Sequence, residues 1–208
     1  MQIQCYTLGS VGTHCYILIN EKTDEALLVD PADRPEVLSE KLTGQGLTLR
    51  GILLTHGHGD HIMAVPGLRE KYQAPVLAHE AEAPLLSDPG LNLSRSLFGT
   101  PLSLKADRLL KDGELVKLAG LSLKVLFTPG HTPGGCCYYA EEEHALLSGD
   151  TLFCASIGRT DFPGGSMRTL VASIREKLMP LPDDTKVYPG HAEFTTLGQE
   201  RAYNPYLQ

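Results

Sequence analysis

The sequence contains no apolar run approaching the roughly 18 residues that a transmembrane helix requires, so we expect no membrane association. Its first residues, Met1–Tyr6, have neither the basic stretch nor the apolar stretch of a signal peptide. The five cysteines are odd in number and include no Cys-x-x-Cys pair, so they give no disulfide framework. We expect free thiols that pack as small apolar side chains. These absences together predict a cytoplasmic protein.

Positive charge is also scarce. The 208 residues include 18 Lys and Arg against 25 Asp and Glu, a net charge of −7, and no basic run exceeds two residues. Binding to a phosphate backbone needs a basic patch, so we expect no nucleic-acid partner. The length predicts a single domain over residues 1–208, and the composition gives no indication of the oligomeric state.

Short β-prone apolar runs alternate with amphipathic segments, which predicts a mixed α and β protein. The expected strands are Cys15–Ile19, Ala26–Val29, Gly51–Thr55, Pro75–Ala78, Leu121–Phe127, Cys136–Ala140, Ala145–Leu147 and Lys186–Tyr188. The expected helices are Arg34–Leu42, Ile62–Tyr72, Ser166–Leu178 and Thr196–Tyr203. Between them, Leu85–Lys105 combines turn residues with several leucines and Phe98, which indicates either a lid or pocket wall or an Ω-loop packed on itself.

Four of the apolar strands end in the same way. Each breaks at Gly, Pro or a small residue and then presents a His or an Asp, in the segments Ile52–His56, Leu126–His131, Leu146–Asp150 and Val187–His191. Ligands of α/β proteins gather outside the carboxyl ends of strands, so these four ends predict one shared site.

The first of these segments continues with three more ligand-type residues, as His56-Gly57-His58-Gly59-Asp60-His61. In an extended chain, alternate side chains face the same way, so His56 and His58 can converge on one ion. Asp60 and His61 are neighbours that diverge once a helix begins, and they can therefore reach a second ion.

Most single histidines are hydrogen-bonded or solvated side chains rather than ligands. We interpret His14, His79 and His144 in this way. Three histidines and one aspartate within six residues serve no packing purpose and would be costly to bury unpaired. With His131, Asp150 and His191 they make seven ligands, which suit two divalent ions about 3.5–4 Å apart with Asp150 shared. Imidazole and carboxylate ligands without thiolate suit Zn²⁺, Fe or Mn²⁺, and ligand type alone does not choose among them. Zn²⁺ is the metal we expect, with Fe or Mn²⁺ as alternatives.

This pattern of His and Asp resembles the metallo-β-lactamase superfamily over most of the chain, from about Val11 to His191. The resemblance implies an α/β (α+β) fold, a four-layer αββα sandwich with the metals at one edge. The ligand sets it implies are His56, His58 and His131 for the first ion, Asp60, His61 and His191 for the second, and Asp150 between them.

Three further motifs resemble the glyoxalase II group of that superfamily: Gly130–Gly135, Ser148–Phe153 and Gly158–Phe162. That group hydrolyses thioesters of glutathione, notably S-D-lactoylglutathione. The ending Tyr188–His191 resembles its short bacterial form, without the helical C-terminal domain that helps long forms hold glutathione. Arg159 falls where long forms carry a substrate-binding lysine, and an ordinary surface ion pair is the alternative interpretation.

The predicted chemistry is metal-assisted hydrolysis of a small-molecule thioester. Water between two cations loses its proton near neutral pH, and the resulting metal-bound hydroxide can attack the thioester carbonyl. Asp60 is the catalytic candidate, because a ligand carboxylate can also accept a hydrogen bond from the hydroxide and aim it. The leaving thiolate needs no strong general acid, since thiols have a pKa near 8.5.

The nearest alternative is a persulfide dioxygenase, a family that also resembles the chain at Gly158–Phe162. It uses one iron on the equivalents of His56, His131 and Asp150, a face of two histidines and one carboxylate. A β-lactamase would require an export signal, and an RNA-processing enzyme would require a basic surface and an extra domain. Lactone hydrolysis and metal binding without catalysis are the remaining alternatives.

Overall fold

The computed structural model describes all residues, 1–208, and contains two six-stranded sheets. The first sheet consists, in spatial order, of β1 (Gln2–Leu8), β2 (Thr13–Asn20), β3 (Glu25–Val29), β4 (Thr48–Leu53), β5 (Val76–His79) and β6 (Arg108–Leu110). Strands β1 to β3 are antiparallel, and β3 to β6 run parallel to one another. The parallel pairs need crossover connections, which the helices supply.

The second sheet is mostly antiparallel. Its order is β14 (Thr195–Thr196), β13 (Lys186–Pro189), β10 (Ala145–Gly149), β9 (Cys136–Ala140), β8 (Leu121–Phe127) and β7 (Leu115–Leu118). Only β10 and β13 are parallel, and their register shifts just before β10 ends. A separate two-stranded hairpin, β11 (Leu152–Phe153) and β12 (Ser156–Ile157), follows β10 directly.

Seven short α-helices complete the chain. They are α1 (Pro35–Gly44), α2 (Gly59–Ile62), α3 (Val65–Tyr72), α4 (Ala83–Ser87), α5 (Ser94–Phe98), α6 (Met167–Ser173) and α7 (Leu197–Tyr203). A π-helical turn over Ile174–Leu178 prolongs α6. No helix has both the length and the apolar character that crossing a bilayer requires.

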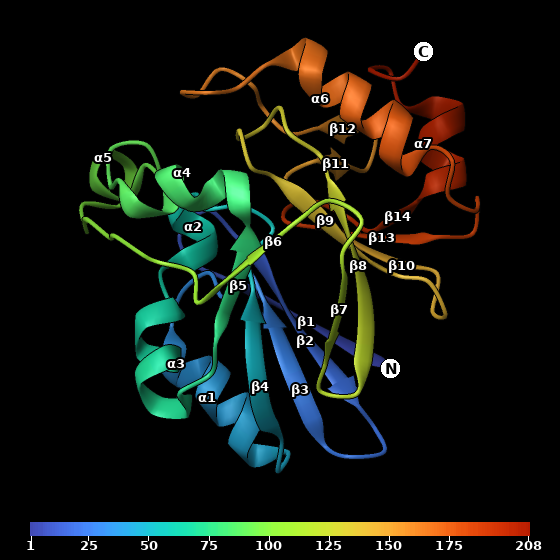
Figure 1. Cartoon of the computed structure of the whole chain (residues 1–208). Coiled ribbons are helices and arrows are strands. Elements are labelled where there is room, and N and C mark those ends of the chain that lie inside the picture. The colour runs from blue at the N-terminus through green and yellow to red at the C-terminus, as the bar shows by residue number, and fades with distance from the viewer.

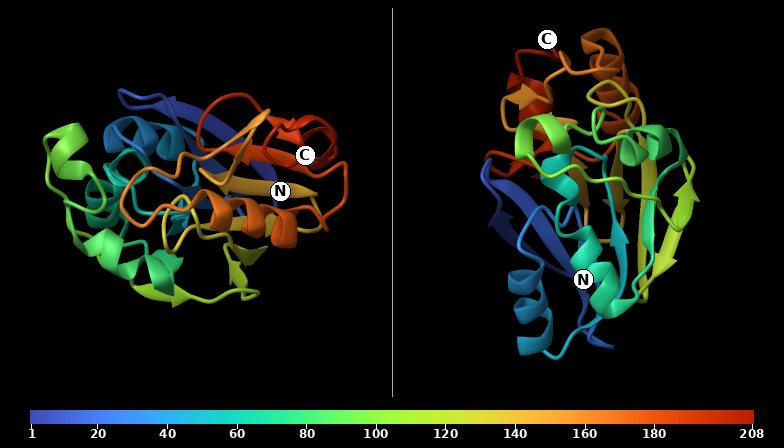
Figure 2. Two further views of the ribbon diagram at one scale, coloured as in Figure 1. Left: turned by 90° about the horizontal axis from the view of Figure 1, so that it is seen from above. Right: turned by 90° about the vertical axis from the view of Figure 1, so that its left-hand side faces the viewer.

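Three separate apolar cores hold the four layers together. Along β2, Ile17 packs with α1 and α3 in the first core, whereas its neighbours Tyr16 and Leu18 face the second sheet in the central core. This alternation follows from the two-residue period of a strand. The third core places Leu170 of α6 and Leu197 of α7 against the outer face of the second sheet. The architecture is therefore α/β/β/α, as the resemblance implied (Figures 1 and 2).

All eight expected strands are present, but two expectations about helices need correction. The predicted helix Ile62–Tyr72 is wrong as a single helix, because α2 ends at Ile62 and α3 starts anew at Val65, with Pro66 in its first turn. Ser166 caps α6 by accepting a hydrogen bond from the Thr169 amide, as expected, but the last predicted turn is π-helical. The segment Leu85–Lys105 is not all loop, since it contains α5.

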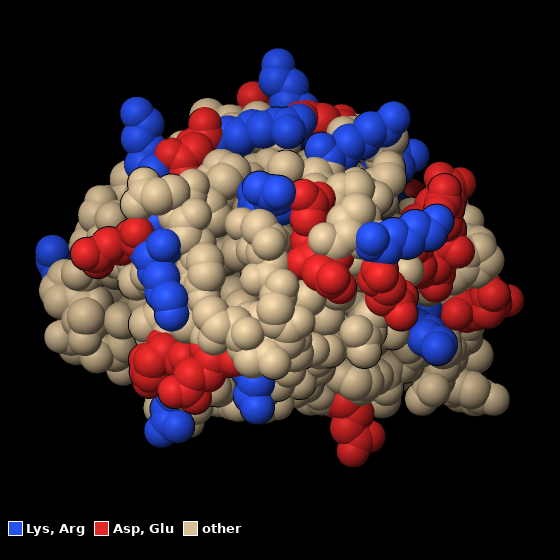
Figure 3. Space-filling model, turned by 90° about the horizontal axis from the view of Figure 1, so that it is seen from below, with Lys and Arg blue, Asp and Glu red and all other residues tan.

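The five cysteines are free thiols. Cys15, Cys136 and Cys137 are buried as expected, whereas Cys5 and Cys154 are only half-buried. The carboxyl ends of β3, β4, β5, β10 and β13 lie toward the upper end of the molecule in Figure 1. Figure 3 shows the opposite end, where Lys and Arg lie interspersed with Asp and Glu rather than as a field of one sign.

Candidate metal centre

All seven predicted ligands lie close together, at the ends of strands and in the first turn of α2. His56 follows β4, His131 follows β8, and His191 follows β13, while the first turn of α2 carries Asp60 and His61. The donor atoms of His56, His58 and His131 lie within 4.8 Å of one another, and the same holds for Asp60, His61 and His191. The two sets match those that the resemblance implied.

Asp150 lies between the two groups. Its Oδ2 is 3.6 Å from His131 Nε2 in the first group and 3.6 Å from His191 Nε2 in the second. Its Oδ1 is 3.4 Å from His61 Nε2. The register shift and the left-handed Gly149 (φ 49°) just before it turn this carboxylate out of the strand and toward both groups. This is the position required of a shared ligand.

The unpaired atoms of the centre test whether divalent cations fit it. Nε2 of His56 and His61 and Oδ1 of Asp150 are buried and have no hydrogen-bond partner. Such orphaned buried groups are rare and costly without a partner. Two atoms that bind a tetrahedral Zn²⁺ at about 2.1 Å lie roughly 3.4 Å apart, close to the 3.4–3.6 Å separations around Asp150. The donor set and its spacing therefore fit divalent cations.

Asp30, which the sequence analysis missed, holds the Nδ1 atom of His61 directly and that of His56 through Thr55. Asp30 Oδ2 accepts hydrogen bonds from His61 Nδ1 at 3.0 Å and from Thr55 Oγ1 at 2.6 Å. Thr55 Oγ1 in turn accepts from His56 Nδ1 at 3.1 Å. One carboxylate thus fixes the ring orientation and tautomer of one histidine in each group, leaving both Nε2 atoms free to bind metal.

A signal for Asp30 was present in the sequence. It follows the apolar β3 and precedes Pro31, the same pattern that marked the four strand ends. Its backbone has φ 49°, a conformation that a non-glycine residue adopts at some cost, and one common at functional sites.

A second buried carboxylate, Glu82, ties the two ligand-bearing loops together. It accepts hydrogen bonds from the Gly57 amide at 2.8 Å, the Thr132 hydroxyl at 3.0 Å and the Gly134 amide at 2.8 Å. Burial raises the pKa of Glu82 to about 7, although these donors oppose the shift. Nothing in the sequence pattern Glu80-Ala81-Glu82 distinguished it from a solvated charge.

Burial and charge set the protonation of the ligands. Burial lowers the pKa of His56 well below its usual value and that of His58 to about 3, so both imidazoles are neutral, as metal ligands must be. The carboxylates of Asp60 and Asp150 raise the pKa of His61 and His191, so a bound cation would have to displace their protons. Burial would raise the pKa of Asp60, but the positive charges of these two histidines outweigh it and hold the pKa below its usual value. Asp60 is therefore ionised.

Two glycines allow the chain to approach Asp150 closely. A Cβ on Gly190 would lie 2.3 Å from Asp150 Oδ1, and one on Gly158 would lie 1.8 Å from the Asp150 carbonyl oxygen. Both distances are below any real contact, so the ligand and its neighbouring loops require glycine at these positions.

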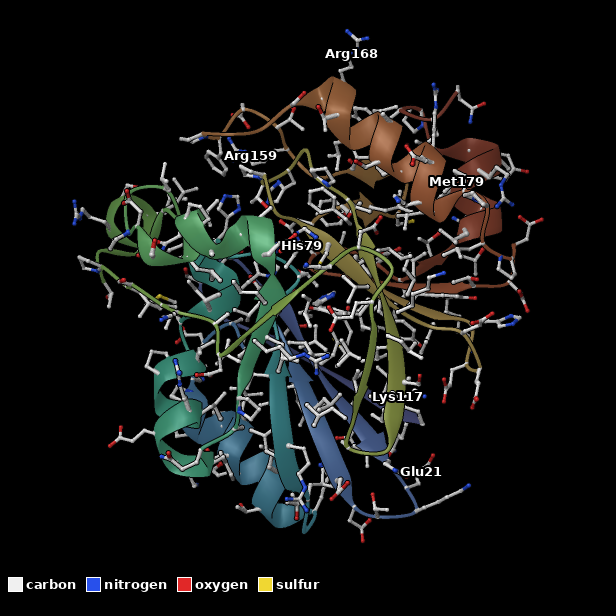
Figure 4. All side chains as sticks on the ribbon, viewed as in Figure 1. Glu21, His79, Lys117, Arg159, Arg168 and Met179 are labelled. Carbon is white, nitrogen blue, oxygen red and sulfur yellow. The ribbon has the colours of Figure 1, made fainter.

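A cavity of about 370 Å³ opens onto the ligands. Leu93, Leu97 and Phe98 line it, so the segment Leu85–Lys105 forms part of the pocket lining, one of the two expected alternatives. Arg159 also lines the cavity, at the upper end of the molecule in Figure 4, on the loop between β12 and α6. Its guanidinium pairs with Asp161 at 2.7 Å, and its carbonyl oxygen accepts a hydrogen bond from His131 Nδ1 at 2.7 Å.

The three remaining histidines lie outside the centre, as interpreted. His14 Nδ1 donates to the Pro189 carbonyl, and His144 pairs with Asp184. His79, labelled in Figure 4, stacks on Phe127 with ring centroids 4.1 Å apart.

The model of the metallo-β-lactamase superfamily matches residues 8–191. This chain belongs to that superfamily. Among its relatives, the probable metallo-hydrolase YqgX of Bacillus subtilis is 42% identical, with 96% of this chain and 94% of that protein covered. The hydroxyacylglutathione hydrolase GloC of Haemophilus influenzae is 35% identical, with 100% and 98% covered.

Three solved structures are similar to this chain over nearly its whole length. BLEG-1, a B3 metallo-β-lactamase, has a TM-score of 0.94 at 42% identity, covering 99% of each chain. TTHA1623 in a di-iron-bound form has a TM-score of 0.87 at 37% identity, covering 98% and 100%. ETHE1 from Myxococcus xanthus has a TM-score of 0.80 at 30% identity, covering 99% and 84%. The protein is thus a member of a metallo-hydrolase superfamily, with His and Asp groups that can hold metal.

Proposed function

We propose that the protein hydrolyses thioesters of glutathione, such as S-D-lactoylglutathione, using two divalent cations. The observation that carries the proposal is the position of Asp150, which reaches two complete ligand groups at the base of one cavity. The similarity to GloC, a hydroxyacylglutathione hydrolase, supports the choice of substrate. Zn²⁺ is the first choice of metal, and the di-iron form of TTHA1623 makes iron the main alternative.

Cations in this centre would supply a water nucleophile at neutral pH and stabilise the negative charge that develops on the thioester oxygen. Asp60 lines the cavity, and Thr13 Oγ1 donates a hydrogen bond to its Oδ2 at 3.0 Å. This anchored carboxylate can orient a water molecule toward the thioester carbonyl. Hydrolysis breaks the C–S bond and forms a C–O bond, and the sulfur leaves as a thiolate that takes up a proton from solvent.

Arg159 is the proposed contact for an anionic group of the glutathione moiety. The side chains of Arg159 and Asp161 are 58% and 65% exposed at the cavity mouth, so a substrate carboxylate can replace Asp161 as the partner of the guanidinium. Small-molecule thioesters are the proposed partners of the protein, and its five free thiols support a location in the reducing cytoplasm.

The second candidate function is persulfide dioxygenation, which the similarity to ETHE1 favours. That chemistry would need one iron on His56, His131 and Asp150. The intact second group in this chain, Asp60, His61 and His191, supports two metals and therefore the hydrolase.

Metal analysis combined with a substrate panel tests the proposal. The panel contains lactoyl, acetyl and mandeloyl glutathione, the corresponding coenzyme A esters, a β-lactam and glutathione persulfide. We expect two metal ions per chain and cleavage of the glutathione esters. One iron per chain, with oxygen uptake on the persulfide and no thioester cleavage, would establish the second candidate instead. Cleavage of the β-lactam alone would overturn both.

A further inference from the structure

The cavity above the metal centre leaves large apolar side chains uncovered. Val11, on the turn between β1 and β2, is 54% exposed, and Leu97, on α5, is 58% exposed, although both line the cavity. Phe98 lies beside them and packs on Gly59, where an added Cβ would come within 2.8 Å of the ring. Exposed apolar side chains gathered around a cavity mark a surface that a ligand covers.

The same cavity offers few polar partners. Besides the metal ligands, its lining includes one charged residue, Arg159, and one hydroxyl residue, Ser156. The Arg159 guanidinium is already paired with Asp161 and lies over the Phe162 ring at 4.0 Å. A hydroxyl or charged group placed against the apolar side chains would lose its water without gaining a hydrogen bond, which is costly.

Arg159 and the apolar side chains lie next to different groups of metal ligands. Arg159 is tied to His131 of the first group through its carbonyl oxygen. Phe98 packs on Gly59, and together with Asp60 of the second group it also lines a small cavity beneath the β1–β2 turn. A thioester whose anionic thiol part lies at Arg159, with its carbonyl at the metal centre, therefore directs its acyl group toward Val11, Leu97 and Phe98.

We propose that the enzyme selects thioesters with an apolar acyl group, branched aliphatic or aromatic, which covers the apolar wall formed by Val11, Leu97 and Phe98. This inference rests on the proposed thioester hydrolysis and specifies its substrate. The small, hydroxylated lactoyl group leaves most of this wall uncovered. Lactoylglutathione is thus a substrate of lower kcat/KM than a larger apolar ester of the same thiol.

A series of glutathione thioesters that differ only in the acyl group tests the proposal. The series consists of lactoyl, acetyl, butyryl, isovaleryl and phenylacetyl esters, measured on metal-loaded enzyme. Full burial of one methylene group is worth about fourfold in affinity, so we expect kcat/KM to rise about two- to fourfold per added methylene. Isovaleryl glutathione, with three more carbons, is then at least about eightfold better than the acetyl ester. Equal kcat/KM across the series overturns the proposal.

Two exposed leucines provide matched variants. Leu97→Ser removes part of the apolar wall, so the ratio of isovaleryl to acetyl kcat/KM falls at least threefold. Leu115, on β7, is 48% exposed and does not line the cavity, so Leu115→Ser leaves the ratio unchanged. The two side chains are exposed to a similar degree, 58% and 48%, so the two substitutions remove similar amounts of packing. An unchanged ratio in Leu97→Ser overturns the role of the wall.

A binding series separates this inference from the proposed function. S-Methyl to S-hexyl glutathione carry an alkyl group in place of the acyl group and cannot be hydrolysed, so calorimetry reports their affinity without chemistry. If no thioester is cleaved but affinity rises with alkyl length, and Leu97→Ser removes that rise, the proposed hydrolysis is wrong and binding of apolar groups by the wall is confirmed. If the thioesters are cleaved and affinity is independent of alkyl length, hydrolysis stands and the apolar wall is wrong.

Discussion

The metal centre and the apolar wall beside it are built in opposite ways. In the centre, His56, His61 and His131 are almost completely buried. Partners from other parts of the fold hold His61 and His131, and Thr55, which Asp30 anchors, holds His56. In the wall, Val11 and Leu97 are more than half exposed, on a turn and a five-residue helix. Rigid strand ends hold the groups that perform chemistry, whereas surface segments that tolerate change meet the variable part of a substrate.

This contrast predicts two kinds of mutational effect. Changes in the centre should lower metal content and kcat together, because the ligands depend on one another through shared partners. Changes at the wall or the cavity mouth should alter KM and substrate preference and leave the metal content intact.

The largest expected effect comes from Asp150→Ala. Asp150 reaches both ligand groups, so its loss should release metal from both and reduce thioester hydrolysis to background. Metal content measured by mass spectrometry alongside the hydrolysis rate checks this. Asp184→Asn is the control, because this exposed carboxylate pairs with His144 and with none of the seven predicted ligands. Retention of two metals in Asp150→Ala would show that the groups are independent.

Glu82→Gln tests the buried carboxyl group that links the two ligand-bearing loops. The pKa of Glu82 is raised by burial to about 7, from an ordinary value of 4.5, so the folded state binds this proton more tightly than the unfolded chain. Its contribution to the free energy of unfolding is therefore complete below pH 4.5 and is lost as the pH rises through 7, by about 3 kcal/mol in total.

The substitution should remove this part of the pH dependence. Denaturant unfolding of metal-free protein between pH 5 and 8 measures it, and Glu80→Gln, at an exposed position two residues earlier, is the control. If wild type and Glu82→Gln lost stability to the same extent between pH 5 and 8, the pKa of Glu82 would not be raised in the folded state.

Asp30→Asn should weaken the centre without emptying it. The amide keeps the size of the side chain but replaces one of the oxygens that accept hydrogen bonds from Thr55 and His61. Loss of such an orienting partner typically costs about 10–100-fold in metal affinity or activity. Asp24→Asn is a matched control, because Asp24 has a similar backbone (φ 53°) but is exposed. Competition with a chelator measures the affinity, and equal values for wild type and Asp30→Asn would contradict the role of Asp30.

The sequence predicted the centre better than the wall for a physical reason. Metal binding demands particular residue types at particular strand ends, and that demand is visible along the chain. The structure brings all seven residues together, while their role as ligands stays a prediction until metal is measured. Asp30 obeyed the same pattern and could have been included. Glu82 could not, because only the packing of distant loops buries it.

The strands of the fold also differed in how well the sequence predicted them. Long apolar runs such as β2 and β8 were predictable, because burial on one or both faces imposes their pattern. The two-residue strands β11, β12 and β14 were not, since they are too short to show a period. Three apolar side chains that share one wall, Val11, Leu97 and Phe98, come from segments with no common pattern.

The smallest expected effect is at the cavity mouth, with Arg159→Ala. The exposed guanidinium should bind an anionic group of lactoylglutathione with the strength of a surface ion pair, so KM should rise about two- to fivefold and kcat should change less. The carbonyl oxygen that holds His131 remains in the variant, so the metal content should be unchanged. Asp161→Asn releases the guanidinium from its partner and should lower KM instead. A loss of metal or of kcat in Arg159→Ala would show that the mouth and the centre are one unit, and an unchanged KM would remove Arg159 from the substrate site.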